Sequence, residues 1–136
     1  MIFGKTSNKP QSRIDCLIGA GTDIHGNVAF SGGLRVDGHV RGNIIALEGK
    51  PSTVVLSEKA RVEGEIRVSH VVINGTVVGP IIGAEYVELQ PKAVVTGDVS
   101  YRKIEIHLGA VLQGRLLHED EVRSDKVVPF KPAAME

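Results

Sequence analysis

Aliphatic side chains alternate with polar or small ones in short stretches that recur along the chain. Val40-Arg41-Gly42-Asn43-Ile44 and Val62-Glu63-Gly64-Glu65-Ile66 are two examples, in which polar residues separate the apolar positions. A period of two indicates a strand with one buried face. The 3.6-residue period of an amphipathic helix does not extend over any useful length. The pattern therefore predicts an all-β protein made of short strands.

A glycine followed two residues later by an aliphatic side chain marks each repeat. The repeat glycines are 16, 22, 15, 18 and 17 residues apart and are Gly26, Gly42, Gly64, Gly79, Gly97 and Gly114. The long interval contains Gly49–Thr53, which we interpret as a loop insertion of five residues. Repeats of this kind are typical of solenoids, in which each repeat buries its apolar side against the next one.

Three aliphatic columns and one column of small residues accompany the repeat glycines. Two residues before the glycine stand Ile24, Val40, Val62, Val77, Val95 and Leu112, and two residues after it stand Val28, Ile44, Ile66, Ile81, Val99 and Leu116. Eight residues before it stand Ile18, Leu34, Leu56, Val71, Leu89 and Ile106, and four before it stand Thr22, Gly38, Ala60, Gly75, Ala93 and Ala110. Large columns beside a small one fit a narrow stacked interior. We predict a single-stranded parallel β-helix of about six coils over residues 14–118.

The first and last coils of such a rod carry unpaired strand edges. Natural β-proteins usually cover these edges, and solenoids need polar caps. The flanking segments 1–13 and 119–136 offer no helical cap, and their composition predicts disordered tails. We therefore expect copies to stack end to end, and like-end contacts would give a filament without polarity. The end-coil residues expected to make these contacts are Ile18, Ile24, Val28, Phe30, Ile104, Ile106, Leu112 and Leu116.

The tails leave two alternatives open. They could fold back over the ends of the rod, which would keep the chain monomeric. The apolar tip Met1, Ile2 and Phe3, followed by Lys5, could be a frayed terminus or a weak anchor on an anionic membrane surface. Many copies on one polymer would strengthen such an anchor through avidity.

Composition and charge narrow the function classes. Sixteen basic residues balance sixteen acidic ones, which argues against a nucleic-acid partner. The one cysteine, Cys16, cannot form an intramolecular disulfide, and its place on an apolar column predicts that it is buried. No apolar run approaches the ~20 residues of a membrane span, and no signal peptide pattern occurs, so we expect a cytoplasmic protein.

Chemistry-bearing motifs are absent from the sequence. The five histidines lack close metal-ligand spacing, no phosphate-binding loop occurs, and Gly19–Asp23 lacks the third glycine of a dinucleotide fingerprint. We therefore expect no catalytic, cofactor-binding or metal-binding residues, no enzyme activity, and assembly without nucleotide. One outward column, Asp23, His39, Arg61, Thr76, Val94 and Val111, becomes apolar toward the C-terminal half, which is a weak sign of lateral contacts.

The repeated units resemble those of the bactofilins, which are bacterial cytoskeletal proteins with a right-handed parallel β-helix between short disordered tails. The resemblance covers roughly residues 14–118, through units such as Ile24-His25-Gly26-Asn27-Val28 and Val95-Thr96-Gly97-Asp98-Val99. Residues 1–5 are similar to the family's membrane-targeting peptide. The resemblance implies right-handed coils, nucleotide-independent polymerisation, a place at the inner face of the cytoplasmic membrane, and scaffolding of cell-wall synthases or hydrolases that shape the cell.

Two other functions remain open. A left-handed hexapeptide-repeat acyltransferase would be an enzyme on a related solenoid, and Ile18-Gly19-Ala20-Gly21-Thr22-Asp23 fits its repeat unit. Its strict period of six, however, runs only through Ile18, Ile24, Phe30 and Val36 before it meets Gly42. A monomeric adaptor built on the same solenoid is the second alternative.

Overall fold

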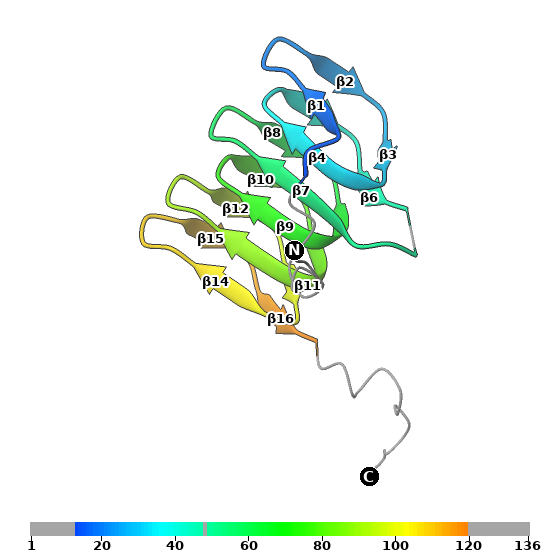
Figure 1. Cartoon of the computed structure of the whole chain (residues 1–136). Coiled ribbons are helices and arrows are strands. Elements are labelled where there is room, and N and C mark those ends of the chain that lie inside the picture. Colours follow the sequence, from blue (N-terminus) through cyan, green and yellow to red (C-terminus); the bar gives the residue numbers. More distant parts are fainter. Residues whose placement is uncertain (1–12, 48, 120–136) are drawn as a thin grey trace, which may run out of the picture.

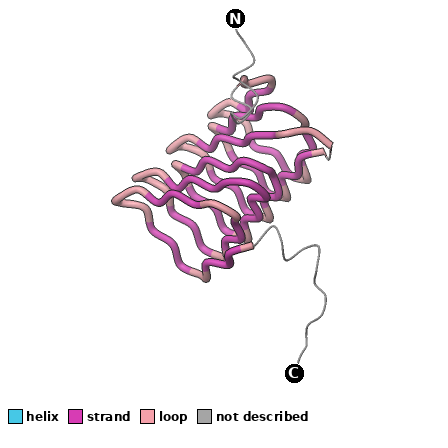
Figure 2. Tube along the Cα trace, turned by 60° about the horizontal axis from the view of Figure 1, so that its bottom comes forward, coloured by secondary structure: helices cyan, strands magenta, loops and turns pink. Residues whose placement is uncertain are grey.

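The computed structural model describes residues 13–47 and 49–119, whose strands form a stacked coil. The described residues contain sixteen strands and no helix. The strands stack from β1 at the N-terminal end to β16 at the C-terminal end (Figure 1). Seen from another side, the coils lie as successive layers of one rod (Figure 2). This arrangement confirms the predicted all-β solenoid, with six coils in the described residues.

Each coil contributes one strand to each of three faces, and neighbouring strands pair in parallel. The first face consists of β1 (Cys16–Ile18), β4 (Gly32–Val36), β7 (Ser52–Leu56), the second parts of β9 (Ile66–Ile73) and β11 (Ile81–Leu89), and β14 (Ile104–Ile106). The second face consists of β2 (Asp23–His25), β5 (His39–Arg41), β8 (Arg61–Glu63), β10 (Thr76–Val78), β12 (Val94–Thr96) and β15 (Val111–Gln113). The third face consists of β3 (Val28–Phe30), β6 (Ile44–Ala46), the first parts of β9 and β11, β13 (Val99–Tyr101) and β16 (Leu116–His118).

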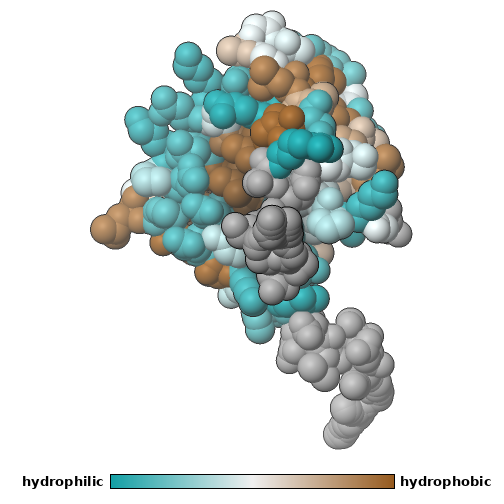
Figure 3. Space-filling model, viewed as in Figure 1, coloured by the Kyte–Doolittle hydropathy of each residue, from teal (hydrophilic) through white to brown (hydrophobic). Residues whose placement is uncertain are grey.

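The inward side chains of the three faces form one narrow aliphatic core. Val40, Val62, Val77 and Val95 follow one another in the register of the second face, and each is fully buried. The column two residues after the glycine is also in register, from Val28 to Leu116 on the third face. Both predicted columns are therefore confirmed. On the outside of the first face, apolar side chains lie among hydrophilic ones (Figure 3).

The column eight residues before the glycine is wrong as a physical column. The register aligns Ile18 with Val36 and Leu56 with Ile73, whereas Leu34 follows Cys16. The corner between the first and second faces has four residues in four coils but only two in the others, at Asp37-Gly38 and Asn74-Gly75. In the two coils with the short corner, the residue eight positions before the glycine lies two residues away from the true member of the column. Because strand side chains alternate with a period of two, that residue is also inward and aliphatic. The pattern therefore looked regular in sequence.

Two further expectations need correction. Ser52 and Thr53 are not in a loop, because they begin β7, pair with Gly32 and Gly33, and are buried. The extra length lies instead between the end of β6 and the start of β7, at residues 47–51. Cys16 does lie in an inward column, but it is exposed rather than buried, because its strand is the outermost strand of the first face.

Candidate assembly ends of the solenoid

The repeat glycines lie at the corner between the second and third faces, where successive coils approach most closely. A Cβ on Gly42, Gly79 or Gly114 would overlap the carbonyl oxygen of the glycine in the preceding coil. At Gly26, in the first coil, no atom lies within 4 Å of such a Cβ. The contact that this column makes in every later coil is therefore vacant at the N-terminal end. Gly26 still needs glycine for its backbone, because its φ is 137°.

Side-chain oxygens next to these glycines connect one coil to the following one. The Asn27 Oδ1 atom accepts a hydrogen bond from the Asn43 backbone N–H at 2.9 Å, and the Asn43 Oδ1 atom accepts one from Glu65 at 2.9 Å. Near the other end, Asp98 Oδ1 accepts one from the Arg115 N–H at 3.0 Å. At three of the coil junctions, a side chain therefore holds the neighbouring coil in addition to the strand ladder.

The C-terminal end exposes inward-facing aliphatic side chains. Ile106 and Leu116 are 46% and 43% exposed, whereas their counterparts in the preceding coil, Leu89 and Val99, are fully buried. Leu108, at the corner of the same coil, is 95% exposed. Exposed apolar side chains on the unpaired edge of the last coil are typical of a contact surface.

The N-terminal end is better closed. Ile18 and Phe30 belong to the buried core, and Ile24 and Val28 are partly buried against it. Phe30 pairs with Ala46 of the next coil, so the large ring occupies the outermost layer of a column whose next member is small. The two ends of the rod are therefore unequal. The predicted contact residues do gather at the two ends, four on the first coil and four on the last.

A charged cluster joins the last two coils on the first face. Glu88 and Glu105 pair directly across β11 and β14, and His107 Nε2 lies 3.1 Å from a Glu88 carboxylate oxygen and 3.2 Å from one of Glu105. The Tyr86 hydroxyl donates to Glu105 at 2.9 Å, and a Glu88 carboxylate oxygen lies 3.3 Å from the same hydroxyl. Burial, followed by these carboxylates, raises the pKa of Tyr86 well above its usual value. The sequence showed none of this, since the residues meet only through the stacking.

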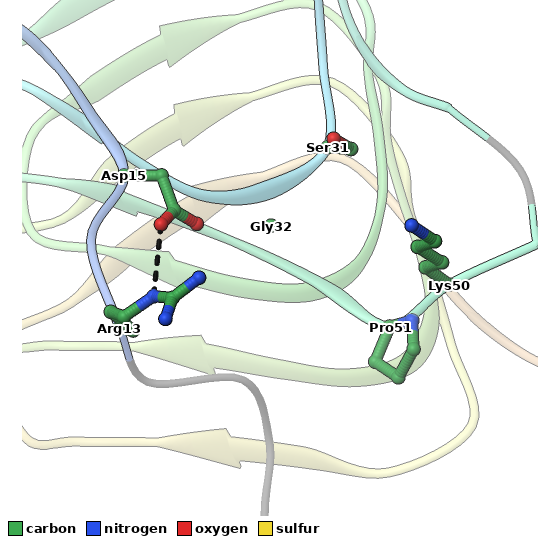
Figure 4. A pocket seen from close by; sticks show the side chains of 6 residues that line it. All are labelled: Arg13, Asp15, Ser31, Gly32, Lys50 and Pro51. Atoms are coloured by element: carbon green, nitrogen blue, oxygen red, sulfur yellow. Dashed lines mark hydrogen bonds and ion pairs between the residues drawn. The ribbon is translucent and has the colours of Figure 1, made fainter.

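A shallow hollow near the N-terminal end offers little chemistry. Arg13 and Asp15 lie on one side of it, and Lys50 and Pro51 lie across from them (Figure 4). Asp15 accepts hydrogen bonds from Arg13 Nε at 2.9 Å and from the Gly33 N–H at 3.0 Å, and the bond from Gly33 is the main cause of its lowered pKa. Its carboxylate is therefore engaged in holding the first strand. In the described parts of the chain, no group of three or more histidine, cysteine or acidic side chains could hold a metal ion.

The tip residues Met1, Ile2, Phe3 and Lys5, together with the segments expected to be tails, lie outside the described residues, except for Arg13 and Glu119. Among the residues that are described, no helix has the length and apolar character needed to cross a membrane.

Comparison with known proteins places this rod in a family. Residues 16–117 match the family model Bactofilin, described as polymer-forming cytoskeletal. The chain belongs to the bactofilin family. Bactofilin BacO of Myxococcus xanthus is 30% identical over 100 residues, which cover 74% of this chain and 76% of the relative. Bactofilins are structural cytoskeletal proteins, so the family predicted from the repeat units is confirmed.

Two solved bactofilin structures have a similar fold. Thermus thermophilus bactofilin, reconstructed by cryo-electron microscopy as double helical filaments, matches with a TM-score of 0.69 and 29% identity over 76% of this chain and 98% of that one. The cytoskeletal bactofilin BacA, solved by solid-state NMR, matches with a TM-score of 0.66 and 31% identity over 76% of this chain and 95% of that one. Both comparisons agree with the β-solenoid described above.

Proposed function

We propose that this bactofilin builds filaments, without nucleotide, by stacking its β-helix end to end. The observation that carries the proposal is the exposure of Ile106 and Leu116 on an unpaired last coil. Stacking another coil there continues the strand ladder and removes these side chains from water, at about 25 cal/mol per Å² of apolar surface. The polymer-forming family and the filament structure of a relative support it.

Like ends meet in the proposed filament. Two apolar last coils that face each other cover both exposed surfaces in one isologous contact. The first coils, which already bury Ile18 and Phe30, then form a second and weaker kind of contact. Contacts of both kinds alternate along the rod, so the filament has no polarity. A double helical filament, as described for the relative, also needs two strands of subunits side by side, and we include such pairing in the proposal.

Leu116→Arg tests the end contact. The arginine places a charge in the surface that must become dry, while Leu47→Arg, at a leucine that is 54% exposed on a side loop, is the matched control. Negative-stain images of purified protein without nucleotide should show filaments for the wild type and for Leu47→Arg. Leu116→Arg should show none, with an unchanged β circular dichroism spectrum. Filaments of normal length from Leu116→Arg would overturn the proposal.

We further propose that Met1, Ile2, Phe3 and Lys5 attach the filament to the inner face of the cytoplasmic membrane, where it organises cell-wall synthases or hydrolases and so contributes to cell shape. The apolar tip followed by basic residues supports this place. Deletion of residues 1–5 should abolish co-sedimentation with anionic liposomes and leave filaments intact. Unchanged liposome binding by the deletion variant would remove the anchor.

A further inference from the structure

The outer surface of the second face divides into two halves of different chemistry. Its outward positions in the first three coils are all charged or titratable: Asp23, His25, His39, Arg41, Arg61 and Glu63. Its outward positions in the last three coils carry no charge: Thr76, Val78, Val94, Thr96, Val111 and Gln113. We call the second set the Val–Thr patch. The first face has a charged outward side chain in a later coil, Glu88, and the third face has one near its middle, Arg67.

The charged half already has partners on its own face. Arg61 Nε lies 2.8 Å from Glu63, Arg41 Nε lies 3.8 Å from Asp23, and His25 Nε2 lies 3.5 Å from the same aspartate. These side chains are exposed and hydrated, and covering them would carry a desolvation cost. The charged half is therefore an unfavourable surface for docking, because its side chains would have to leave water.

The Val–Thr patch has the opposite character. Val94 pairs with Thr76 on one side and Val111 on the other, and Thr96 lies between Val78 and Gln113, which makes a regular grid of mostly β-branched side chains. Val78, Val94 and Val111 are 39%, 39% and 44% exposed. Among the described strand residues, Leu17, Ile106 and Leu116 are the other large hydrophobic side chains exposed to this degree, and they lie in the first or the last coil.

We propose that the Val–Thr patch is the surface on which a second copy, in a neighbouring filament, packs face to face. This inference rests on the proposed function, because it names the contact that pairs two strands of subunits. An uncharged grid of mostly β-branched side chains is complementary to itself, and two such sheets pack about 10 Å apart. The neighbouring charged half limits sliding along the rod, since a shifted partner would cover the ion pairs of Arg61 and Arg41.

The small size of the patch defines how the pairing works. Three strands about 4.8 Å apart, each three residues long at about 3.3 Å per residue, give a footprint of roughly 140 Å². A stable protein–protein contact buries about 800 Å² on each partner. A free subunit therefore cannot pair through this patch, whereas a filament repeats it at every subunit and adds the weak contacts together. Pairing follows polymerisation and depends on it.

Val94→Arg tests the patch at its centre, and Val94→Thr is the matched control because it keeps a β-branched, uncharged side chain. Cryo-electron microscopy class averages and mass per length should show paired strands for the wild type and for Val94→Thr. Val94→Arg should show single strands with the same axial repeat and about half the mass per length. Thr96→Arg, at an exposed position of the same grid, provides a second variant if the first does not fold.

The outcomes separate this inference from the proposed function. Paired strands in folded Val94→Arg and Thr96→Arg, or single strands in the wild type, overturn the patch but leave end stacking in place. Loss of all filaments in both folded variants also overturns it, since the patch would then belong to the end contact. A wild type that forms no filaments removes the proposed function itself. A variant blocked at both ends, Val28→Arg with Leu116→Arg, should stay monomeric in analytical ultracentrifugation, and side-by-side dimers of it would contradict the dependence on polymerisation.

Discussion

At the residue scale, the glycine column shows what stacking demands of a single position. The repeat glycines could be found in the sequence because the same atom meets the same neighbour in every coil. The physical reason for the glycines could not be found there. An added Cβ would overlap the carbonyl of a residue that lies 15 to 22 positions earlier in the chain. The exposure of Cys16 was missed for the same reason, because an inward direction gives burial only where another coil lies above.

Gly42→Ala should therefore destabilise the fold strongly. Gly42 has no left-handed φ, so the effect isolates the overlap between the new methyl group and the Gly26 carbonyl oxygen. Overpacking of this kind costs about 1–3 kcal/mol, which urea unfolding of an end-blocked monomer would measure. Gly21→Ala is the control, since Gly21 also lacks a left-handed φ and no atom lies within 4 Å of its Cβ position. Equal losses in the two variants would contradict the stacking explanation.

At the scale of the element, corner length decided what the sequence could predict. Strand alternation and the glycine spacing were enough to place the columns on the second and third faces. A fixed offset from the repeat glycine could not place the column on the first face. The chain turns in two residues at Asp37-Gly38 and Asn74-Gly75, whereas the other coils use four. A shift of two leaves the hydrophobic pattern unchanged, so only the hydrogen-bond register could reveal the true column.

The Asp98–Arg115 pair, in the corners just before β13 and β16, predicts a pH dependence. Hydrogen bonds from Arg115, first from its side chain and then from its backbone, lower the pKa of Asp98 below the ordinary value of 3.8. A depressed carboxyl pKa stabilises the folded state above the unfolded value, and this contribution is lost as the pH falls through the folded pKa. Asp98→Asn should therefore show a smaller loss of stability than the wild type between about pH 5 and pH 2, measured by thermal unfolding. An identical acid profile would exclude Asp98 as a contributor.

At the scale of the whole molecule, the sequence predicted that both ends of the rod contact other copies. It did not predict that the two ends differ in the exposure of their apolar side chains. Both end sets are entirely apolar in the sequence, and Phe30 was expected to be a contact residue like the others. In the structure, Ile18 and Phe30 are buried while Ile106 and Leu116 are not, so closure of the N-terminal end depends on packing that no periodicity reveals. The residues of the Val–Thr patch gave only a weak sign of lateral contacts in the sequence. Their arrangement as a grid becomes visible only from the strand register of three coils.

Single-end variants test whether like ends meet. If filaments lack polarity, Leu116→Arg retains the contact between first coils and Val28→Arg retains the contact between last coils. Each variant should then form dimers at high concentration in analytical ultracentrifugation, with the Val28→Arg dimer the tighter of the two. A head-to-tail filament uses both ends in every contact, so monomers from both variants would exclude the non-polar arrangement.

The inequality of the two ends has a mechanical consequence. In the proposed filament, contacts between last coils alternate with contacts between first coils, so stronger and weaker links follow one another along the rod. Under shear or dilution we expect the proposed filament to part first at the contacts between first coils, so that its fragments contain even numbers of subunits and end in the first coil. Regrowth of the proposed filament should then begin from ends at which Ile18 and Phe30 are already buried.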